Sequence, residues 1–327
     1  MSSKNERNIL ESTIKKAQYE HFDEWVQNFA LNLPDIWNDS SVKELDPSKD
    51  GNYSSSKNSA IVIGRGPAIN KHKHLKILAE SNFKGSIVCC DGKLIDALDA
   101  GVTPEKFPKF YVTTIDPYPA IMQHYDHKIV DEFGSKIKGI FTSISNPDVI
   151  LRARIAGIKI HWLHSLFDYN EGKKSFNQIS ALMVRAKNHE NGLPAIQTGG
   201  NVGTSSWFIS WKILHCSQIA LIGINHGWEE DDSWETILSH GNNYKITKDL
   251  DRNSDTFQKL YKKIFNPDFK CNCILDPLFQ FYSGALKEFI KRSPVWVNTI
   301  NATEGGSIFG ERIQSMKFTD FLQKHEK

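Results

Sequence analysis

The chain has 327 residues, of which 39% are hydrophobic and 11% aromatic, so it can bury a core in one large domain or two small ones. Its 40 basic and 38 acidic residues are interspersed and leave a net charge of +2, which argues against a nucleic-acid partner. No apolar run approaches the roughly 18 residues of a membrane span, and the polar N-terminus is unlike a secretory signal. We therefore expect a cytoplasmic protein with reduced cysteines.

Apolar side chains recur at helical intervals over residues 6–37, which predicts one or two amphipathic helices. The Ser-rich stretch 48–58 is typical of an exposed linker. We expect an N-terminal helical extension over 1–57, a main domain over 58–315 and a C-terminal helix over 316–327. Exposed apolar residues on the N-terminal helices are compatible with a homodimer.

From residue 59 onward, short apolar runs alternate with helical stretches. The runs cover 61–63, 86–90, 110–115, 139–142, 159–163, 219–224 and 295–297. This alternation predicts an α/β fold, a Rossmann-like doubly wound and mostly parallel sheet with helices on both faces. The long segment 227–255 interrupts the pattern, and its aromatic residues Trp228, Trp234, His240 and Tyr244 argue against simple disorder. We favour a lid, with an acceptor or partner site as the alternative.

A glycine turn, formed by Gly64, Arg65, Gly66 and Pro67, follows the first of these runs. A helical stretch from Ile69 to Ser81 comes next, on which we expect His72 and His74 to face solvent. Strand, turn and helix in this order are where doubly wound folds place a nucleotide phosphate. The third glycine of the dinucleotide fingerprint is missing, as is an acidic residue about 20 positions on, so a nicotinamide cofactor is not expected.

A second glycine turn contains Gly199, Gly200, Asn201, Gly203 and Thr204, and a helix is predicted over 205–214. The N–H groups and positive dipole end of such a helix would face a phosphate or a carboxylate. The alternative is that these glycines only permit tight packing.

Polar residues follow several of the predicted strands, at the edge where ligands bind in parallel sheets. Asp91 and Asp116 each close a strand, so both carboxylates should meet at one rim, to hold Mg²⁺, to accept hydrogen bonds from sugar hydroxyls or to cap helices. His226 is a candidate general acid or base, with a supporting role for the lid as the alternative. Glu304 is the second candidate acid.

Several familiar sites are missing from the sequence. Cys271 and Cys273 are too close for a zinc ribbon, and Cys89-Cys90 lies at the end of a predicted buried strand. There is no nucleophile elbow, no phosphate-loop Gly-Lys-Ser/Thr and no His-Glu-x-x-His helix. Group transfer from a nucleotide is the chemistry that remains.

The chain resembles, over roughly residues 58–312, the superfamily that joins motility accessory factor proteins, which are flagellin glycosyltransferases, to the MptE-like 6-hydroxymethylpterin diphosphokinases. The resemblance rests on Gly64-Arg65-Gly66-Pro67-Ala68, Cys90-Asp91-Gly92, Thr114-Ile115-Asp116-Pro117, Gly199-Gly200-Asn201-Val202-Gly203-Thr204, Leu221-Ile222-Gly223-Ile224-Asn225 and Asn301-Ala302-Thr303-Glu304-Gly305-Gly306. The second glycine string and the last string are the most specific.

The two branches imply different reactions. The accessory-factor branch implies a glycosyltransferase that uses a CMP-activated nonulosonic (sialic-acid-like) sugar without a metal, with a glycan or protein acceptor. The pterin branch implies Mg²⁺-dependent diphosphate transfer from ATP, with Asp91 and Asp116 as metal ligands. The chain leans toward the first, since it has Thr-Ile-Asp-Pro where the pterin enzymes carry a Thr-Asp-Leu-Asp-Gly type string.

Two further points bear on that resemblance. Asn225 stands where the accessory-factor branch usually has Asp, so a metal or base role does not carry over to it, and we place it among the ligand-binding residues. A module that binds a nucleotide or sugar without catalysis is the third hypothesis.

Overall fold

The computed structural model describes residues 21–50, 58–166, 175–187, 192–233, 235–237, 255, 258 and 261–325. Its helices are α2 (Phe22–Asn38), α3 (Ala68–Lys71), α4 (His74–Glu80), α5 (Leu94–Asp99), α6 (Lys128–Phe133), α7 (Pro147–Ile155), α8 (Phe176–Arg185), α9 (Val202–Lys212), α12 (Pro277–Arg292) and α13 (Phe318–His325). Short 3-10 turns η1 (Val42–Leu45), η2 (Pro47–Asp50), η4 (Asp91–Lys93), η5 (Pro119–His124) and η6 (Gly134–Lys136) join them.

The strands form two sheets. The large sheet contains β1 (Ser40–Ser41), β2 (Ser59–Ile63), β3 (Ser86–Cys90), β4 (Phe110–Thr114), β5 (Lys138–Thr142), β6 (Lys159–Leu166), β7 (Ala195–Gln197), β8 (Gln218–Ile222), β12 (Asn298–Asn301) and β13 (Ile313–Ser315). The small antiparallel sheet contains β9 (Trp228–Glu229), β10 (Lys262–Asn266) and β11 (Cys271–Leu275), in the order β10-β11-β9.

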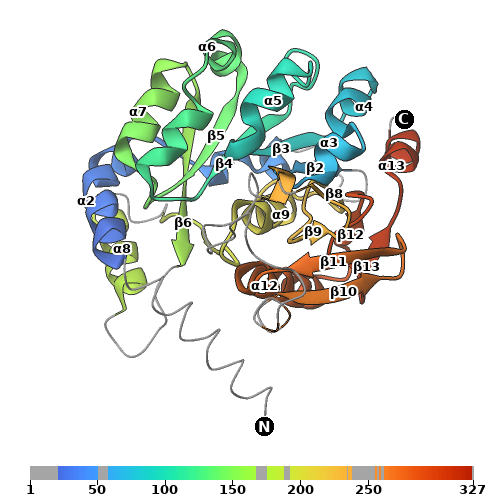
Figure 1. The fold of residues 1–327 in the computed structure, drawn as a ribbon. Helices are drawn as coiled ribbons and strands as arrows, with labels where there is room; N and C mark the ends of the chain where they lie inside the picture. The colour runs from blue at the N-terminus through green and yellow to red at the C-terminus, as the bar shows by residue number, and fades with distance from the viewer. Residues whose placement is uncertain are drawn as a thin grey trace.

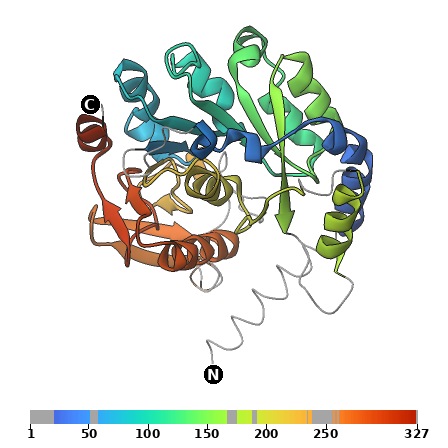
Figure 2. The same cartoon turned by 180° about the vertical axis from the view of Figure 1, so that it is seen from behind.

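The large sheet is parallel throughout, with the order β1-β6-β5-β4-β3-β2-β8-β12-β13 and β7 beside β6. Hydrophobic cores lie on both of its faces. On β2, Ile61 and Ile63 belong to one core and Ala60 and Val62 to the other, as the alternation of a strand buried on both sides requires. Figure 1 shows α4–α7 along one face and α9 with α12 toward the other; Figure 2 shows the reverse view. The predicted Rossmann-like, doubly wound fold is confirmed.

Two predicted elements are wrong in their bounds. The apolar run 295–297 is a turn, in which Val297 N–H donates to Pro294 O at 3.0 Å and Val295 is 91% exposed; the strand follows at Asn298, where the chain pairs with β8. The single helix expected over 69–81 is two, α3 and α4, because Lys73 adopts the left-handed conformation with φ 54°.

The N-terminal extension packs against the sheet. Phe29, Leu33 and Ile36 of α2 are buried in the same core as Ile61, and β1 extends the sheet by pairing Ser40 with His161. The predicted helix over 6–37 is seen as α2 from Phe22; residues 1–20 and 51–57 lie outside the described residues. The division of the chain at residues 57 and 315 stays a prediction. None of the described helices combines the length and apolar character that crossing a bilayer requires.

Two asparagines on α2 hold the loops at the carboxyl ends of β4 and β5. Asn28 Nδ2 donates to Pro117 O at 3.0 Å and to Ile144 O at 3.1 Å. Asn32, one helical turn on, donates to Ser143 O at 3.1 Å and to Ser145 O at 2.8 Å. Both side chains are buried, at 5% and 2% exposure, so the carbonyls they satisfy have no access to bulk water. The N-terminal helix thus fixes part of the rim where the polar residues gather.

We expect Asn32→Ala to lower the free energy of unfolding by about 1–3 kcal/mol, because two buried carbonyls lose their donor. Gln27→Ala, at an exposed position of the same helix, is the matched control and should change it by less than about 0.5 kcal/mol. Urea denaturation followed by circular dichroism measures both. Equal values for the two variants would contradict the role of Asn32.

Candidate functional site

The sheet has a switch point between β2 and β8. From β2 the chain builds β3, β4, β5 and β6 in order on one side, and it returns to β8 on the other side. In doubly wound sheets, ligands bind in the crevice outside the carboxyl ends of the strands at this point. The loop after β2 contains Gly64–Pro67, and the loop after β8 contains residues 223–227. The candidate site therefore lies at these loops.

Hydrogen bonds join these two loops directly. Gly64 N–H donates to Ile222 O, and Gly66 N–H donates to Gly223 O, both at 2.8 Å. The Asn225 side chain takes part too, since its Oδ1 accepts from Ala68 N–H at 3.4 Å. The amides of Gly64 and Gly66 are thus engaged within the protein, and Pro67 has no N–H. A nucleotide phosphate at this turn stays a prediction. The group of this turn that faces outward is the exposed side chain of Arg65.

Gly66 is required by this close approach. A Cβ at Gly66 would lie 2.2 Å from Asn225 Oδ1 and 2.6 Å from Gly223 O. Both atoms belong to the buried loop after β8 and cannot easily move. The glycine therefore serves loop-to-loop contact.

The two carboxylates lie at one rim, as predicted. Asp91 follows β3 and is 4% exposed; its Oδ1 accepts from Gly92 N–H at 2.7 Å and its Oδ2 from the Thr114 hydroxyl at 2.9 Å. The Tyr125 hydroxyl lies 2.6 Å from Thr114 Oγ1, which extends this network into the core. Asp116, two residues past β4, is close enough for its charge to act on Asp91.

Burial raises the pKa of both carboxyl groups. The pKa of Asp91 rises to about 7, because burial and the neighbouring Asp116 charge outweigh its hydrogen bonds and the positive charge of Arg65. The pKa of Asp116 rises to about 6 through burial. Two such groups close together titrate as a pair, and one of them holds a proton over part of the neutral range. The rim can therefore accept or release a proton near pH 7.

The second glycine turn opens α9, as predicted. Gly199 and Gly200 have φ angles of 59° and 83°, and Asn201 caps the helix because its Oδ1 accepts from Thr204 N–H at 2.9 Å. This cap uses the amide of Thr204. The amides of Val202 and Gly203 belong to the first turn of α9. N–H groups in the first turn of a helix have no carbonyl acceptor within that helix. Those two groups and the helix dipole are what α9 offers an anion.

His226 lies beside this helix end. Its backbone is left-handed, with φ 41°, and its Nε2 lies 3.3 Å from Asn201 Oδ1. Because that oxygen is an acceptor for Thr204 N–H, the pair fits a neutral ring with the proton on Nε2. Burial, assisted by the positive charge of Lys287, lowers the His226 pKa to about 3. A lowered pKa favours an uncharged ring at neutral pH, which donates a hydrogen bond from Nε2. The role of His226 as general acid or base stays a prediction.

Glu304 and His74 form a separate contact. Glu304 Oε1 lies 3.4 Å from His74 Nε2 and accepts from Phe318 N–H at 3.1 Å, which ties the loop after β12 to α4 and α13. Burial alone would raise the Glu304 pKa, but these hydrogen bonds hold it below its usual value. The expectation that His74 faces solvent is wrong: it is 0% exposed, and its ring packs on Phe318 with centroids 5.4 Å apart. The half-buried His72 stacks on it. The acid role of Glu304 stays a prediction.

Part of the site comes from distant segments. Tyr282 of α12 lies over the α9 turn, where a Cβ on Gly200 would be 2.4 Å from its Cε1. Burial raises the Tyr282 pKa, and the charge of Asp116 raises it further. Local sequence pattern does not place Tyr282 at the site, because its position depends on how α12 docks. The Lys71–Glu229 ion pair at 2.5 Å, which ties α3 to β9, was missed for the same reason.

The predicted lid is seen only at its start. Trp228 and Glu229 form β9, which pairs with β11 and so belongs to the small sheet. Trp234, His240 and Tyr244 lie outside the described residues, and the lid stays a prediction. Within the described part of the chain, no group of three or more His, Cys, Asp or Glu side chains is arranged to hold a metal ion.

Comparison with known proteins places this geometry in context. A family model described as 6-hydroxymethylpterin diphosphokinase MptE-like matches residues 27–231. Among solved structures, the MAf glycosyltransferase from Magnetospirillum magneticum AMB-1 is similar, with a TM-score of 0.54 and 14% sequence identity. The alignment covers 83% of this chain but 36% of that one, so this chain spans about a third of its length. No curated protein matches the chain.

Gly66→Ala should lower the free energy of unfolding by about 1–3 kcal/mol, because the added methyl group clashes with the loop after β8. Gly284→Ala is the control: that position lies within α12 with nothing within 4 Å, so alanine should stabilise by about 0.5–1 kcal/mol. Thermal and urea denaturation of both variants compares them. A neutral Gly66→Ala would show that the loops are not in contact.

We also expect Asp91→Asn to flatten the pH dependence of stability. The folded state raises the Asp91 pKa from 3.8 to about 7, so it binds the proton more tightly than the unfolded chain, and this stabilisation is lost as the pH rises through about 7. Between pH 5 and pH 8 the wild type should lose about 2 kcal/mol more than the variant.

Asp99→Asn, which removes an exposed carboxylate from the end of α5, is the control and should follow the wild type. Urea denaturation at both pH values measures the difference. Parallel curves for wild type and Asp91→Asn would contradict the raised pKa.

Proposed function

Because the chain belongs to the 6-hydroxymethylpterin diphosphokinase MptE-like family, we propose that it is a nucleotide-dependent transferase, and specifically a glycosyltransferase with a CMP-activated nonulosonic sugar as donor. The observation that carries the proposal is the buried Asp91 and the half-buried Asp116 at the carboxyl ends of β3 and β4, close to Arg65 of the loop after β2. The likeness of the fold to a solved glycosyltransferase supports it.

The donor phosphate would bind between Arg65 and the first turn of α9. When the bond between sugar and CMP breaks, negative charge builds up on the departing phosphate. A fixed guanidinium and oriented N–H groups stabilise that charge without reorganisation. His226, held neutral by burial, would add a hydrogen bond from Nε2 if Asn201 released it. In this scheme departure is assisted by positive charge and hydrogen bonds, and no protonated histidine is required.

The carboxylates would act on the acceptor. With a pKa of about 7, Asp91 can take the proton of an attacking hydroxyl group near neutral pH, where a base of matched pKa is most effective. The Thr114 hydroxyl and Gly92 N–H fix its two oxygens, so the carboxylate is already oriented. Asp116 would accept a hydrogen bond from a sugar hydroxyl. A glycan or a protein side chain with a hydroxyl group fits as acceptor.

The same pair of carboxylates supports a second candidate, Mg²⁺-dependent diphosphate transfer from ATP to a pterin. A divalent cation would relieve the repulsion by which the Asp116 charge raises the pKa of Asp91, and Mg²⁺ commonly binds one or two carboxylates together with substrate phosphates. Asp91 and Asp116 would be the protein ligands, and a metal would then supply charge stabilisation of the phosphates. We rank this candidate second because the chain has Thr114-Ile115-Asp116-Pro117 where the pterin enzymes carry a Thr-Asp-Leu-Asp-Gly type string.

A cytoplasmic location is part of the proposal. Cys89, Cys90, Cys216, Cys271 and Cys273 are all free thiols, as a reducing compartment maintains them. Cys271 and Cys273 have Sγ atoms 3.9 Å apart and no bond between them.

A thermal-shift panel with CMP, CTP, ATP and ADP, each with and without Mg²⁺, tests the proposal. A ligand that binds only the folded state raises the melting temperature. At a ligand concentration of 100 times its Kd, the free energy of unfolding rises by about 2.7 kcal/mol. We expect a shift with CMP that does not need Mg²⁺ and that Arg65→Gln reduces. Lys128→Gln, an exposed cation at the start of α6, is the control and should keep the shift.

An ATP shift that requires Mg²⁺ and is lost in Asp91→Asn would select the diphosphokinase. No shift with any nucleotide would overturn both candidates. A CMP shift without sugar transfer from any CMP-sugar would leave a module that binds nucleotides without catalysis.

A further inference from the structure

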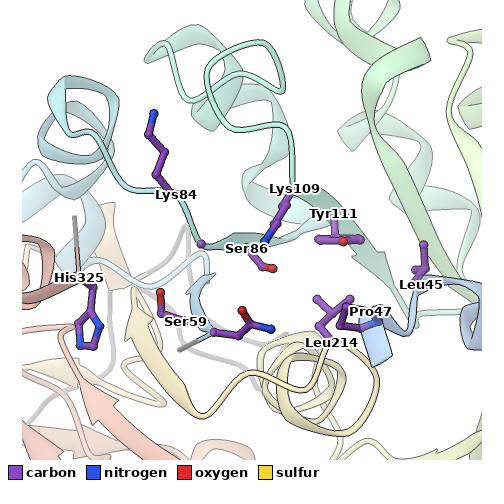
Figure 3. A pocket seen from close by; sticks show the side chains of 11 residues that line it. Leu45, Pro47, Ser59, Lys84, Ser86, Lys109, Tyr111, Leu214 and His325 are labelled. Atoms are coloured by element: carbon purple, nitrogen blue, oxygen red, sulfur yellow. The ribbon is translucent and has the colours of Figure 1, made fainter. Parts of the chain in front are cut away.

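A cavity of about 130 Å³ lies at the edge of the sheet opposite the candidate site (Figure 3). Ser59 and Ser86, which line it, are the first residues of β2 and β3, and Lys109 directly precedes β4. Leu45, Pro47 and Leu214 line one side, and His325 of α13 lies at the other. Because the candidate site lies at the carboxyl ends of the same strands, this cavity is separate from it.

The lining is polar and carries only positive charge. No carboxylate lines the cavity; its ionisable residues are Lys84, Lys109, Tyr111 and His325. In Figure 3 the Lys109 side chain turns toward Ser86, whereas Lys84 extends away from the cavity. Over the described ranges, Lys109 has no carboxylate within ion-pair distance. Lys109 is an exposed residue at the mouth of the cavity, and its uncompensated ammonium group attracts an anion there.

Uncharged hydrogen-bonding groups surround this charge. Ser59 and Ser86 are each 7% exposed, and the Ser86 hydroxyl also contacts the Cys216 thiol. Asn58 and Tyr111 add an amide and a phenol. One cation with donors on several sides suits a tetrahedral oxyanion, whereas a planar carboxylate is typically bound by the fork of an arginine, which is missing from this lining.

The size of the cavity limits the ligand. At about 30 Å³ for each water molecule, the space holds roughly four waters, which fits a phosphate group but does not enclose a whole nucleotide. We propose that this cavity is a phosphate-binding site in which Lys109 supplies the charge and Ser59 and Ser86 supply hydrogen bonds. The phosphate is either the free ion or the terminal group of a larger phosphomonoester that extends into solvent.

Titration calorimetry with inorganic phosphate at constant ionic strength tests this site. We expect saturable binding by the wild type that Lys109→Gln weakens at least about tenfold, since a charge-assisted hydrogen bond is lost. Lys128→Gln is the matched control: it removes an exposed cation that does not line the cavity and should leave this binding unchanged. Arg65→Gln removes the cation of the proposed nucleotide site and so separates phosphate binding at the two sites. Glycerol phosphate is the second probe, and binding of phosphate but not of this ester would identify the free ion as the ligand.

Three outcomes would overturn the proposal. One is the absence of saturable binding. Another is equal binding by Lys109→Gln and wild type, and the third is binding that Arg65→Gln abolishes and Lys109→Gln retains, which would place the phosphate at the nucleotide site. Ser59→Ala is a second variant of the same site, in case Lys109→Gln does not fold. Loss of phosphate affinity in both variants with unchanged melting temperatures would support phosphate binding in the cavity.

Discussion

The contact between the loops that follow β2 and β8 is the constraint on which the site depends. Two backbone hydrogen bonds and the Asn225 side chain join these loops, and the joint leaves no room for a Cβ at Gly66. The buried N–H groups of Gly64, Gly66 and Ala68, between β2 and α3, therefore have hydrogen-bond acceptors within the protein. The Arg65 side chain then extends outward past Gly92. A Cβ added to Gly92 would lie 3.1 Å from Arg65 Cδ. A turn built for packing thus also places the positive charge of the site.

The buried carboxylates show a conflict between stability and chemistry. Asp91 is enclosed, lies near a second carboxylate and receives two hydrogen bonds, so its pKa rises to about 7 even though those bonds favour the charged form. Each proton removed above that pKa leaves negative charge in a site that excludes water. A folded protein gains nothing from such a pair in stability, and raised carboxyl pKa values are typical of acid–base sites. Hence the proposal gives the proton transfer to Asp91, while His226, which burial keeps neutral, is limited to hydrogen bonding.

The sequence predicted the central strands well and the joints between elements poorly. Strands β2–β6 and β8 are buried on both faces, so they appear as β-branched or aromatic runs that periodicity can find, and Asp91 and Asp116 follow from the rule for strand ends. The run 295–297 misled because it is apolar yet forms a turn, whereas the strand after it contains two asparagines. The burial of His74 and the use of Gly64 and Gly66 amides depend on contacts made by α13 and by the loop after β8. Such contacts join residues more than 150 positions apart, and local pattern does not contain them.

Helix α12, which covers one side of the candidate site, lies outside the region matched by the family model. The matched region ends at residue 231, whereas Tyr282 belongs to α12 and covers the turn at Gly200 while its pKa responds to Asp116. The family relationship therefore bears on the rim of carboxylates and on the start of α9. It does not bear on α12, whose Phe279 and Tyr282 lie beside His226. A transferase selects its substrates by the groups that surround the reacting atoms, so in the proposed function α12 would contribute to substrate choice in a way that the family match does not describe.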